Sequence, residues 1–237
     1  MMRLFLGCFL FLSFFMGYSQ EKENTFSIDT LHVKIDSLYR EDQFYAGINY
    51  NSLIKKPDGV SQSKISFGFF GGFLRDMPIN KKRTFAIAPG IGFSFNNYLQ
   101  NMAITGSGQN PVYTVIPSDV HYDKSRFEQF RVEFPIEIRW RDSDPVTYQF
   151  FRIYSGFKLS YLLLDKSVFD DGINKIVVKN NKDFEDFLYS VYVSVGYSAF
   201  NLQVHYNLNS FFKSSAQIDS VPITMNALSI GVIYYIL

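Results

Sequence analysis

Residues 131–141 read Arg-Val-Glu-Phe-Pro-Ile-Glu-Ile-Arg-Trp-Arg and alternate between two kinds of side chain. The odd positions are charged apart from Pro135, and the even positions, from Val132 to Trp140, are all large and apolar. Successive side chains of a strand point to opposite faces, so the run predicts a β-strand with one oily face and one ionic face. A soluble sheet usually carries mixed polar residues on its wet face and confines Pro to an edge, so the pattern favours lipid against the oily face.

Seven further segments alternate in the same way and bring the number of predicted strands to eight. They place Phe, Tyr, Ile, Leu or Val on one face and mainly Gly, Ser, Ala, Asn or charged residues on the other. These segments are residues 44–50, 65–70, 85–96, 151–161, 189–198, 200–209 and 227–236. Nine to eleven residues at about 3.3 Å each, tilted by about 40°, cross an apolar band roughly 25 Å tall. We therefore predict an all-β fold, an eight-stranded antiparallel up-and-down transmembrane β-barrel over residues 43–237.

Aromatic residues near the strand ends support a membrane barrel over a soluble one. Tyr50, Trp140, Tyr161, Tyr189 and Tyr197 stand where the aromatic girdles of outer-membrane barrels lie. A soluble lipocalin-like barrel would need the opposite arrangement, with an oily interior and a wet exterior. The predicted inner faces carry Gly, Ser, Ala, Asn and paired charges instead, so the pattern favours lipid outside.

The connections between the predicted strands alternate in length. Long connections are expected at residues 52–63, 99–125, 165–186 and 211–223, and short ones at residues 75–82, residues 142–147 and Ser198. Outer-membrane barrels have short periplasmic turns and longer extracellular loops. We therefore expect the short turns and both termini to face the periplasm of a Gram-negative cell.

The first residues predict export. One basic residue, Arg3, precedes a Leu- and Phe-rich stretch and a small-x-small ending, so residues 1–19 form an expected signal peptide cleaved after Ser19. An uncleaved anchor would need a longer apolar run. A lipoprotein site at Cys8 is a weaker alternative, because this cysteine precedes any usable apolar region. Residues 20–42 would then be a periplasmic leader.

Charge and cysteine content exclude several classes of function. The formal net charge of +1 argues against nucleic acid as a partner. The one cysteine leaves with the signal peptide, so the exported chain has neither a disulfide nor a thiol nucleophile. No segment after residue 20 is apolar for long enough to form a membrane helix. We predict no cofactor and no metal site.

Two groups of residues stand out beyond what a barrel requires. The first is a Pro-containing basic turn that could offer a shaped surface to a periplasmic protein, or could merely be solvated; its candidate residues are Arg75, Asp76, Met77, Pro78, Lys81, Lys82 and Arg83. The second is an ionic group on the predicted inner faces, made of Arg131, Glu133, Glu137, Arg139, Arg141, Arg152 and Lys158. Charges confined in a narrow barrel must pair, which predicts a salt-bridge plug; a proton or ion path is the alternative.

The chain resembles the PorT family, the small outer-membrane barrels of the type IX secretion and gliding machinery of Bacteroidetes. The resemblance is carried by Arg-Asp-Met-Pro-Ile-Asn-Lys-Lys-Arg at 75–83, Glu-Phe-Pro-Ile-Glu-Ile-Arg-Trp-Arg at 133–141 and Phe-Arg-Ile-Tyr-Ser-Gly-Phe-Lys at 151–158. It extends over most of residues 44–237. It implies a non-enzymatic component needed to secrete cargo, with protein partners of the secretion machinery and with outer-membrane lipid around it. The family supplies no catalytic residues to transfer.

Two other functions stay open from the sequence. An adhesin or receptor would act through the long extracellular loops. A lipid-modifying barrel enzyme would need a His, a Ser and an acid near the rim, and His121, Asp123 and Ser125 cluster in one loop. His205 is a further candidate on a predicted inner face, although a loop His beside an Asp is usually only solvated.

Overall fold

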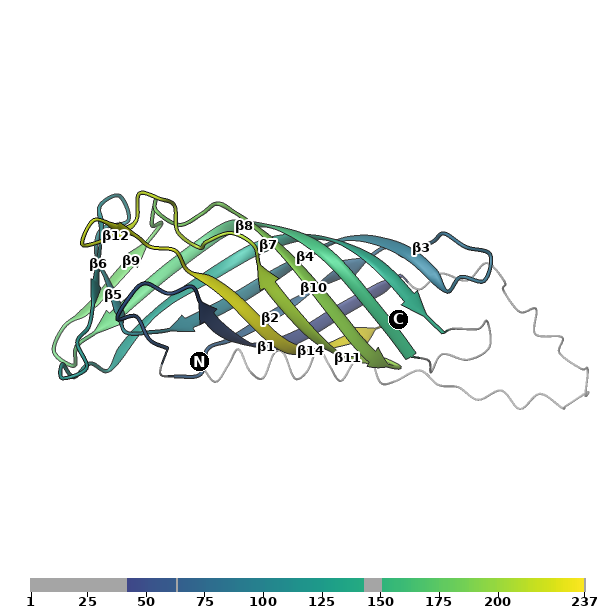
Figure 1. Cartoon of the computed structure of the whole chain (residues 1–237), viewed down its shortest axis with the longest axis horizontal. Coiled ribbons are helices and arrows are strands. Elements are labelled where there is room, and N and C mark those ends of the chain that lie inside the picture. Colours follow the sequence, from purple (N-terminus) through teal and green to yellow (C-terminus); the bar gives the residue numbers. More distant parts are fainter. Residues whose placement is uncertain (1–41, 63, 143–150, 237) are drawn as a thin grey trace, which may run out of the picture. The chain divides into compact units, whose positions relative to one another are not determined.

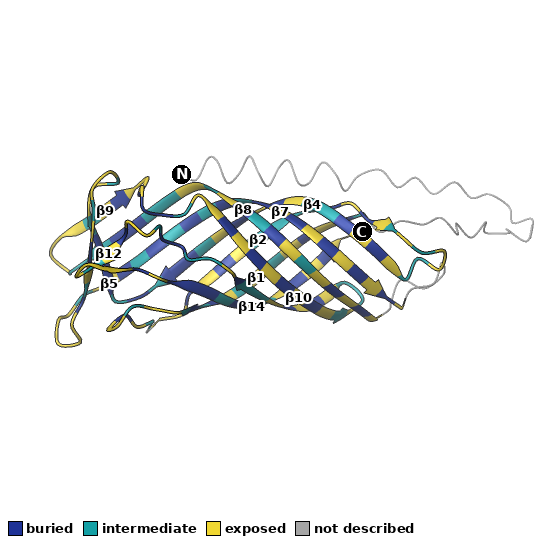
Figure 2. Cartoon of the chain, turned by 45° about the horizontal axis from the view of Figure 1, so that its top comes forward, coloured by how far each residue is buried: buried dark blue, intermediate teal, exposed yellow. Residues whose placement is uncertain are grey.

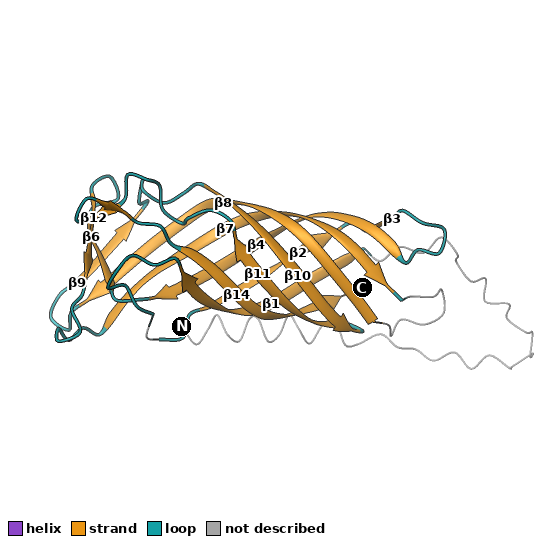
Figure 3. Ribbon diagram, in the orientation of Figure 1, coloured by secondary structure: helices purple, strands orange, loops and turns teal. Residues whose placement is uncertain are grey.

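The computed structural model describes residues 42–62, 64–142 and 151–236. The expected signal peptide, the leader up to residue 41 and most of the turn predicted at 142–147 lie outside these described residues. Among the described residues, no helix is long and apolar enough to cross a membrane. The described chain is built of strands joined by turns and loops (Figure 3).

Eight antiparallel strands close into a barrel, as the sequence predicts (Figure 1). Neighbours along the chain pair with one another, and the last strand pairs with the first, with Phe44 opposite Ile236. The barrel strands are β1 (Gln43–Ile54), β2 (Phe67–Leu74), β4 (Phe85–Leu99), β7 (Lys124–Arg141), β8 (Phe151–Asp170), β10 (Phe187–Tyr197), β11 (Phe200–Asn207) and β14 (Asn226–Ile236). Closure pairs the backbone groups of every strand on both sides, which is the condition for crossing lipid.

Six shorter strands lie at the two ends of this barrel. The two-residue strand β3 (Met77–Pro78) pairs with β4. The others are β5 (Met102–Gly106), β6 (Pro111–Val115), β9 (Lys175–Lys179), β12 (Gln217–Ile218) and β13 (Val221–Pro222). Figure 1 shows β3 at one end and β5, β6, β9 and β12 at the other. We call these the turn end and the loop end.

The strands are staggered around the barrel. Following paired residues from Phe67 through β1, β14, β11, β10, β8, β7 and β4 returns to Met77, ten residues further along the chain. Such a stagger requires the strands to tilt by about 40° from the barrel axis. Strands of the observed length, tilted in this way, span an apolar band roughly 25 Å tall.

The burial pattern follows the predicted alternation (Figure 2). In β7, Ile136 and Ile138 are 53% and 62% exposed, whereas Glu137 and Arg139 between and beside them are 2% and 0% exposed. The exposed face is apolar around the whole barrel, so it is the lipid-facing surface, and the charged face lines the lumen. The prediction that the oily face of residues 131–141 points outward is confirmed.

Strands β7 and β8 are longer than predicted. They contain 18 and 20 residues and continue past the lipid-facing region at the loop end. The register between them shifts where Phe130 pairs with Leu164 but Arg131 pairs with Leu162, so Leu163 is an extra residue in a β-bulge. The connection expected at 99–125 does join β4 to β7 and contains the short β5–β6 hairpin, whereas the one expected at 165–186 is partly wrong, because β8 continues to Asp170 and β9 follows it.

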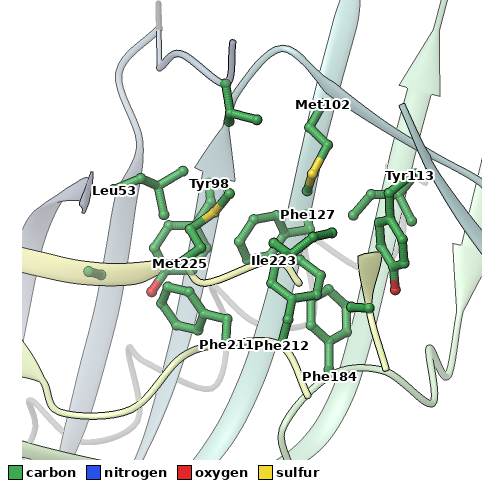
Figure 4. Close-up of a cluster of buried hydrophobic side chains, with 14 of the residues drawn as sticks. Leu53, Tyr98, Met102, Tyr113, Phe127, Phe184, Phe211, Phe212, Ile223 and Met225 are labelled. Carbon is green, nitrogen blue, oxygen red and sulfur yellow. The ribbon is translucent and has the colours of Figure 1, made fainter. Parts of the chain in front are cut away.

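Loop segments at the loop end pack into a hydrophobic cluster, which we call the cap (Figure 4). The buried members of the cap are Leu53, Val60, Tyr98, Met102, Ile104, Tyr113, Phe127, Phe184, Leu188, Phe211, Phe212, Ala216, Ile223, Met225 and Ala227. Phe127 is fully buried at its centre, and its ring lies 4.8 Å from that of Tyr98 and 5.5 Å from that of Phe184. The cap thus fills the barrel mouth with side chains from distant parts of the chain.

A polar contact fastens the β5–β6 hairpin to the cap. The hydroxyl of Tyr113 lies 3.1 Å from both Asn181 Oδ1 and Asp183 Oδ2. Burial raises the pKa of Tyr113 well above its ordinary value, so the phenol stays neutral and can donate a hydrogen bond. The hairpin is therefore part of a packed structure.

Replacing Phe127 by Ala should destabilise the barrel by about 3 kcal/mol, because a large buried ring leaves a cavity in the cap. Phe134→Ala is the matched control on the same strand, since its ring is 43% exposed on the lipid-facing side. Unfolding in detergent, followed by the shift of the heated band on gels, measures both. Equal loss of stability in the two variants would contradict the packed cap.

Candidate functional site

The basic turn begins where the pairing of β2 with β4 is interrupted. Pro89 of β4 has no N–H to offer, although its carbonyl oxygen accepts a hydrogen bond from the Arg75 N–H at 2.9 Å. The pairing resumes at β3 in the same register, with Met77 opposite Ile87. The alternation is therefore kept through the break, and Asp76 points into the lumen, where its side chain is fully buried.

Two arginines of β7 bind the Asp76 carboxylate. Arg141 donates two hydrogen bonds to it, from Nη1 to Oδ1 and from Nη2 to Oδ2, each 2.9 Å long. Arg139 donates a third from Nη1 to Oδ1 at 3.1 Å. The side chains of all three residues are completely buried. A two-pronged guanidinium–carboxylate contact fixes direction as well as distance, so this junction holds β3 against β7.

The second carboxylate of this network is Glu137. Its Oε2 accepts a hydrogen bond from Arg139 Nε at 2.8 Å, and its Oε1 accepts one from the Tyr192 hydroxyl at 2.8 Å. Tyr192 reaches it across Gly156, where an added Cβ would lie only 2.4 Å from the tyrosine ring. The glycine therefore makes room for a bond that links β10 to β7.

Aromatic rings enclose the arginines. The Arg139 guanidinium lies 4.8 Å from the centre of the Tyr154 ring and 5.9 Å from that of Tyr235. Arg152 lies 5.9 Å from the centre of the same Tyr154 ring. Cation–π contacts of this kind are strongest where water is excluded, and they offset part of the cost of burying the charges. We call this group of residues the turn-end network; its members are Asp76, Glu137, Arg139, Arg141, Arg152, Tyr154, Tyr192 and Tyr235.

The same network shapes the tip of the turn. Arg141 Nε donates to the carbonyl oxygen of Arg83 at 3.0 Å, and the Arg141 N–H donates to that of Thr84 at 2.9 Å. Within the tip, Asn80 Oδ1 accepts from the Phe85 N–H and Asn80 Nδ2 donates to Thr84 Oγ1. The tip is thus bonded both to itself and to the buried core of the barrel.

The predicted candidates of the turn divide into four sets. Asp76 is buried, so the expectation that it belongs to a partner-facing surface is wrong for this residue. Met77 is 45% exposed on the outer face beside Ile87, which makes it part of the lipid-facing surface, while Pro78 is half-buried. Lys81 and Lys82 are exposed at the tip.

The remaining two candidates are held by contacts. The carbonyl oxygen of Arg83 accepts a hydrogen bond from Arg141, and the backbone of Arg83 has a positive φ of 57°. Arg75 forms an ion pair with Asp42 at 2.7 Å, and the Asp42 carboxylate also accepts a hydrogen bond from the Asp76 N–H. The surface that is left for a partner is therefore Lys81 and Lys82, flanked by the half-exposed side chain of Arg75.

The rest of the predicted lumen cluster lies nearer the middle of the barrel. Lys158 Nζ forms an ion pair with Glu133 Oε2 at 2.8 Å, a pair across β7 and β8. Arg131 binds Gln129 Oε1 and, with its Nη atoms, the carbonyl oxygens of Glu185 and Asp186. The predicted cluster is thus divided into three parts: the turn-end residues, the Glu133–Lys158 pair, and Arg131, which binds backbone oxygens near the loop end.

A small polar cavity lies between these groups and the cap. It measures about 40 Å³, enough for roughly three water molecules. Its wall includes Asn49, Ser94, Glu133, Lys158 and His205. Side chains therefore fill the lumen next to the cap, apart from this cavity, which has room for only a few water molecules.

The possible catalytic residues of the second long loop do not assemble into a triad. His121 lies 3.6 Å from Asp123, and both side chains are largely exposed. Ser125 is buried, and its hydroxyl donates to the carbonyl oxygen of Met102. His205 lies in the lumen with its ring 6.5 Å from that of Tyr192. Among the described residues, no three His, Cys, Asp or Glu side chains are grouped so as to hold a metal ion.

Two features of the site were not predicted from the sequence. Asp76 and the inward tyrosines were not part of the predicted ionic cluster. The signal for Asp76 was its spacing, because it lies two residues after the inward Leu74. The tyrosines carried no such signal, since Tyr also marks the lipid boundary of membrane barrels.

The closed sheet, the apolar exterior and the polar lumen define an outer-membrane type of β-barrel. A family model described as "Outer membrane protein beta-barrel domain" matches residues 18–214, and the chain belongs to this family. No curated protein matches the sequence significantly.

Several solved structures resemble the chain weakly. One is Ail, the attachment invasion locus protein of Yersinia pestis, at 11% identity and a TM-score of 0.37, covering 83% of this chain and 99% of that one. Two others are mutants of the Rh. blastica porin, at 6% and 7% identity with TM-scores of 0.21 and 0.22, each covering 82% of this chain and 99% of its own. Likenesses at this level transfer no function.

Glu137→Ala should lower the stability of the barrel by about 3 kcal/mol or more, because it leaves Arg139 and Tyr192 buried without this partner. Glu128→Ala on the outer face of the same strand is the control and should cost about 1 kcal/mol or less, since its ion pair with Arg126 is partly exposed. Heated gels in detergent give both unfolding transitions. An unchanged transition for Glu137→Ala would contradict the structural role of the network.

Proposed function

We propose that the protein is a non-enzymatic outer-membrane component of a type IX-like protein secretion machinery, similar to the PorT family. In this proposal the turn end and both termini face the periplasm. Lys81 and Lys82 form the contact surface for a periplasmic or membrane partner of the machinery. The barrel anchors or helps assemble that partner.

One observation supports this proposal above the others. The three stretches that carry the resemblance, residues 75–83, 133–141 and 151–158, lie far apart in the chain but meet in the turn-end network. The first supplies Asp76, the second supplies Glu137 and two arginines, and the third supplies residues that include Tyr154. A shared purpose for the three stretches is to hold the basic tip in one position.

The filled lumen favours a role at the rim of the barrel. The cap packs side chains into the loop end, and the turn-end network fills the opposite end. A folded or extended cargo chain needs far more room than a cavity of about 40 Å³. Secreted cargo would therefore pass elsewhere, and the barrel would act by binding.

Lys81→Gln combined with Lys82→Gln should reduce cargo secretion about tenfold, because it removes both tip charges. The barrel should still reach the membrane at normal levels, since neither side chain is buried. The matched control is Lys55→Gln combined with Lys56→Gln, two exposed adjacent lysines at the loop end. Secreted cargo and barrel abundance are measured in the same cells.

Normal secretion by the Lys81/Lys82 variant would contradict docking through the tip and leave it as a solvated turn. Equal loss in the control variant would point to a general effect of charge. Affinity purification of the tagged barrel from native membranes adds a direct test. It should recover envelope secretion proteins with the wild type and fewer with the tip variant.

An adhesin or receptor is the second candidate, and exposed apolar residues at the loop end favour it. Ile173 is 91% exposed and Val221 is 61% exposed at loop tips. Removing residues 101–120 would be a poor test, because that segment supplies Met102 and Tyr113 to the cap. Ile173→Ser is a better test than this deletion. It should weaken attachment of the cells to a surface only if the loops bind that surface, and it should leave secretion unchanged.

A further inference from the structure

A groove of about 490 Å³ lies on the outer surface of the barrel near the loop end. Two rows of outward side chains line it. Phe95, Phe130 and Leu164 stand side by side on β4, β7 and β8 and form its apolar part. Glu128, Lys166 and Lys179 form the next row toward the loop end, on β7, β8 and β9.

The β-bulge in β8 extends the apolar surface beside this groove. The extra residue Leu163 breaks the alternation, so that Leu163 and Leu164 are both exposed, by 45% and 63%. Beside them the ring of Phe130 stacks on that of Phe93, with centroids 5.8 Å apart and planes at 2°. The result is a flat apolar wall suited to a hydrocarbon chain.

The two lysines at the rim face each other without an intervening acid. Lys166 is directly opposite Lys179 in the β8–β9 pair, and like charges in that position destabilise a sheet. The other neighbour of Lys166 is Glu128, whose carboxylate forms a 2.7 Å ion pair with Arg126. Among the described residues, neither lysine has an ion pair within the chain. An anion that bridges the two ammonium groups would remove their repulsion.

A second acid, Asp165, also lines the groove. Its carboxylate accepts a hydrogen bond from the Asn181 N–H at 3.1 Å, so it is engaged by the chain itself. The height of the lysines fits a lipid headgroup. Lys166 lies five residues after Tyr161, one of them the bulged Leu163, and is therefore about 10 Å further along the barrel axis once the bulge and the tilt are included.

We propose that this groove binds a phosphorylated, acylated lipid of the surrounding leaflet. An acyl chain lies over Phe95, Phe130 and Leu164, and a phosphate bridges Lys166 and Lys179 as a charge-assisted contact. This inference takes from the proposed function only its orientation, in which the leaflet at the loop end is the outer one. The groove would then hold lipid A, the phosphorylated and acylated disaccharide anchor of lipopolysaccharide.

Native mass spectrometry of the purified barrel in neutral detergent tests the proposal, with bisphosphorylated lipid A as the probe. Lys166→Gln combined with Lys179→Gln should weaken binding about tenfold. Lys55→Gln combined with Lys56→Gln removes the same charge at the same end and should bind like the wild type. Lipid A stripped of phosphate should bind the wild type no better than the groove variant binds the intact lipid.

Lys179→Glu is the control for a loss of lipid binding that is caused by misfolding of the barrel. It replaces a like-charged pair across β8 and β9 by an opposite one, so the barrel should be at least as stable as the wild type. It should nevertheless lose lipid binding. Wild-type affinity in both groove variants, or equal loss in the Lys55/Lys56 control, would overturn the proposal. The assay contains no secretion partner, so its failure would leave docking through Lys81 and Lys82 untouched.

Discussion

A backbone amide inside a lipid layer has no water to bind, and this constraint decides the rest of the structure. It forces the sheet to close, and closure of only eight strands makes a narrow lumen. A charged inward side chain must then find its partner within that lumen. Apolar residues such as Ile136 and Ile138 are free to face lipid, whereas Glu137 and Arg139 between and beside them must be matched inside.

The buried charged side chains of the lumen are paired by long side chains that reach across it. Two arginines of β7 share the Asp76 carboxylate, Glu137 binds Arg139 and Tyr192, and tyrosine rings cover the guanidinium groups. The Tyr192–Glu137 bond joins two strands that are not neighbours in the sheet, and the bonds from the arginines to Asp76 tie the turn to the barrel wall. Burying charges in this way does not by itself stabilise a protein more than apolar packing would, but it specifies one arrangement. Here that arrangement fixes the position of the basic tip.

The sequence predicted the parts of the fold that depend on alternation. All eight strands and the outward direction of their apolar faces could be read from runs such as residues 131–141, because lipid imposes the period of two on each strand separately. The loop end was not predictable in this way. Leu163 enters as an unsignalled extra residue in β8, and the cap forms from residues as distant as Leu53 and Met225.

The candidate site, too, could be predicted only in part from the sequence. The charged residues of β7 and β8 were evident from their spacing, and so was the basic turn. Asp76 belongs to the buried charged residues and not to the exposed basic turn. This follows from the stagger of the strands, which brings residue 76 level with residues 139 and 141. Such long-range juxtaposition leaves no mark on a single sequence.

Hydrogen–deuterium exchange of the backbone tests most directly whether buried charges hold the tip. Asp76→Asn keeps the size of the side chain but removes the charge that binds both arginines. If the network holds the tip, the amides of residues 79–85 exchange faster in this variant, with no change at the β10–β11 turn around Ser198. Unchanged exchange at residues 79–85 would show that the turn-end network does not position the tip.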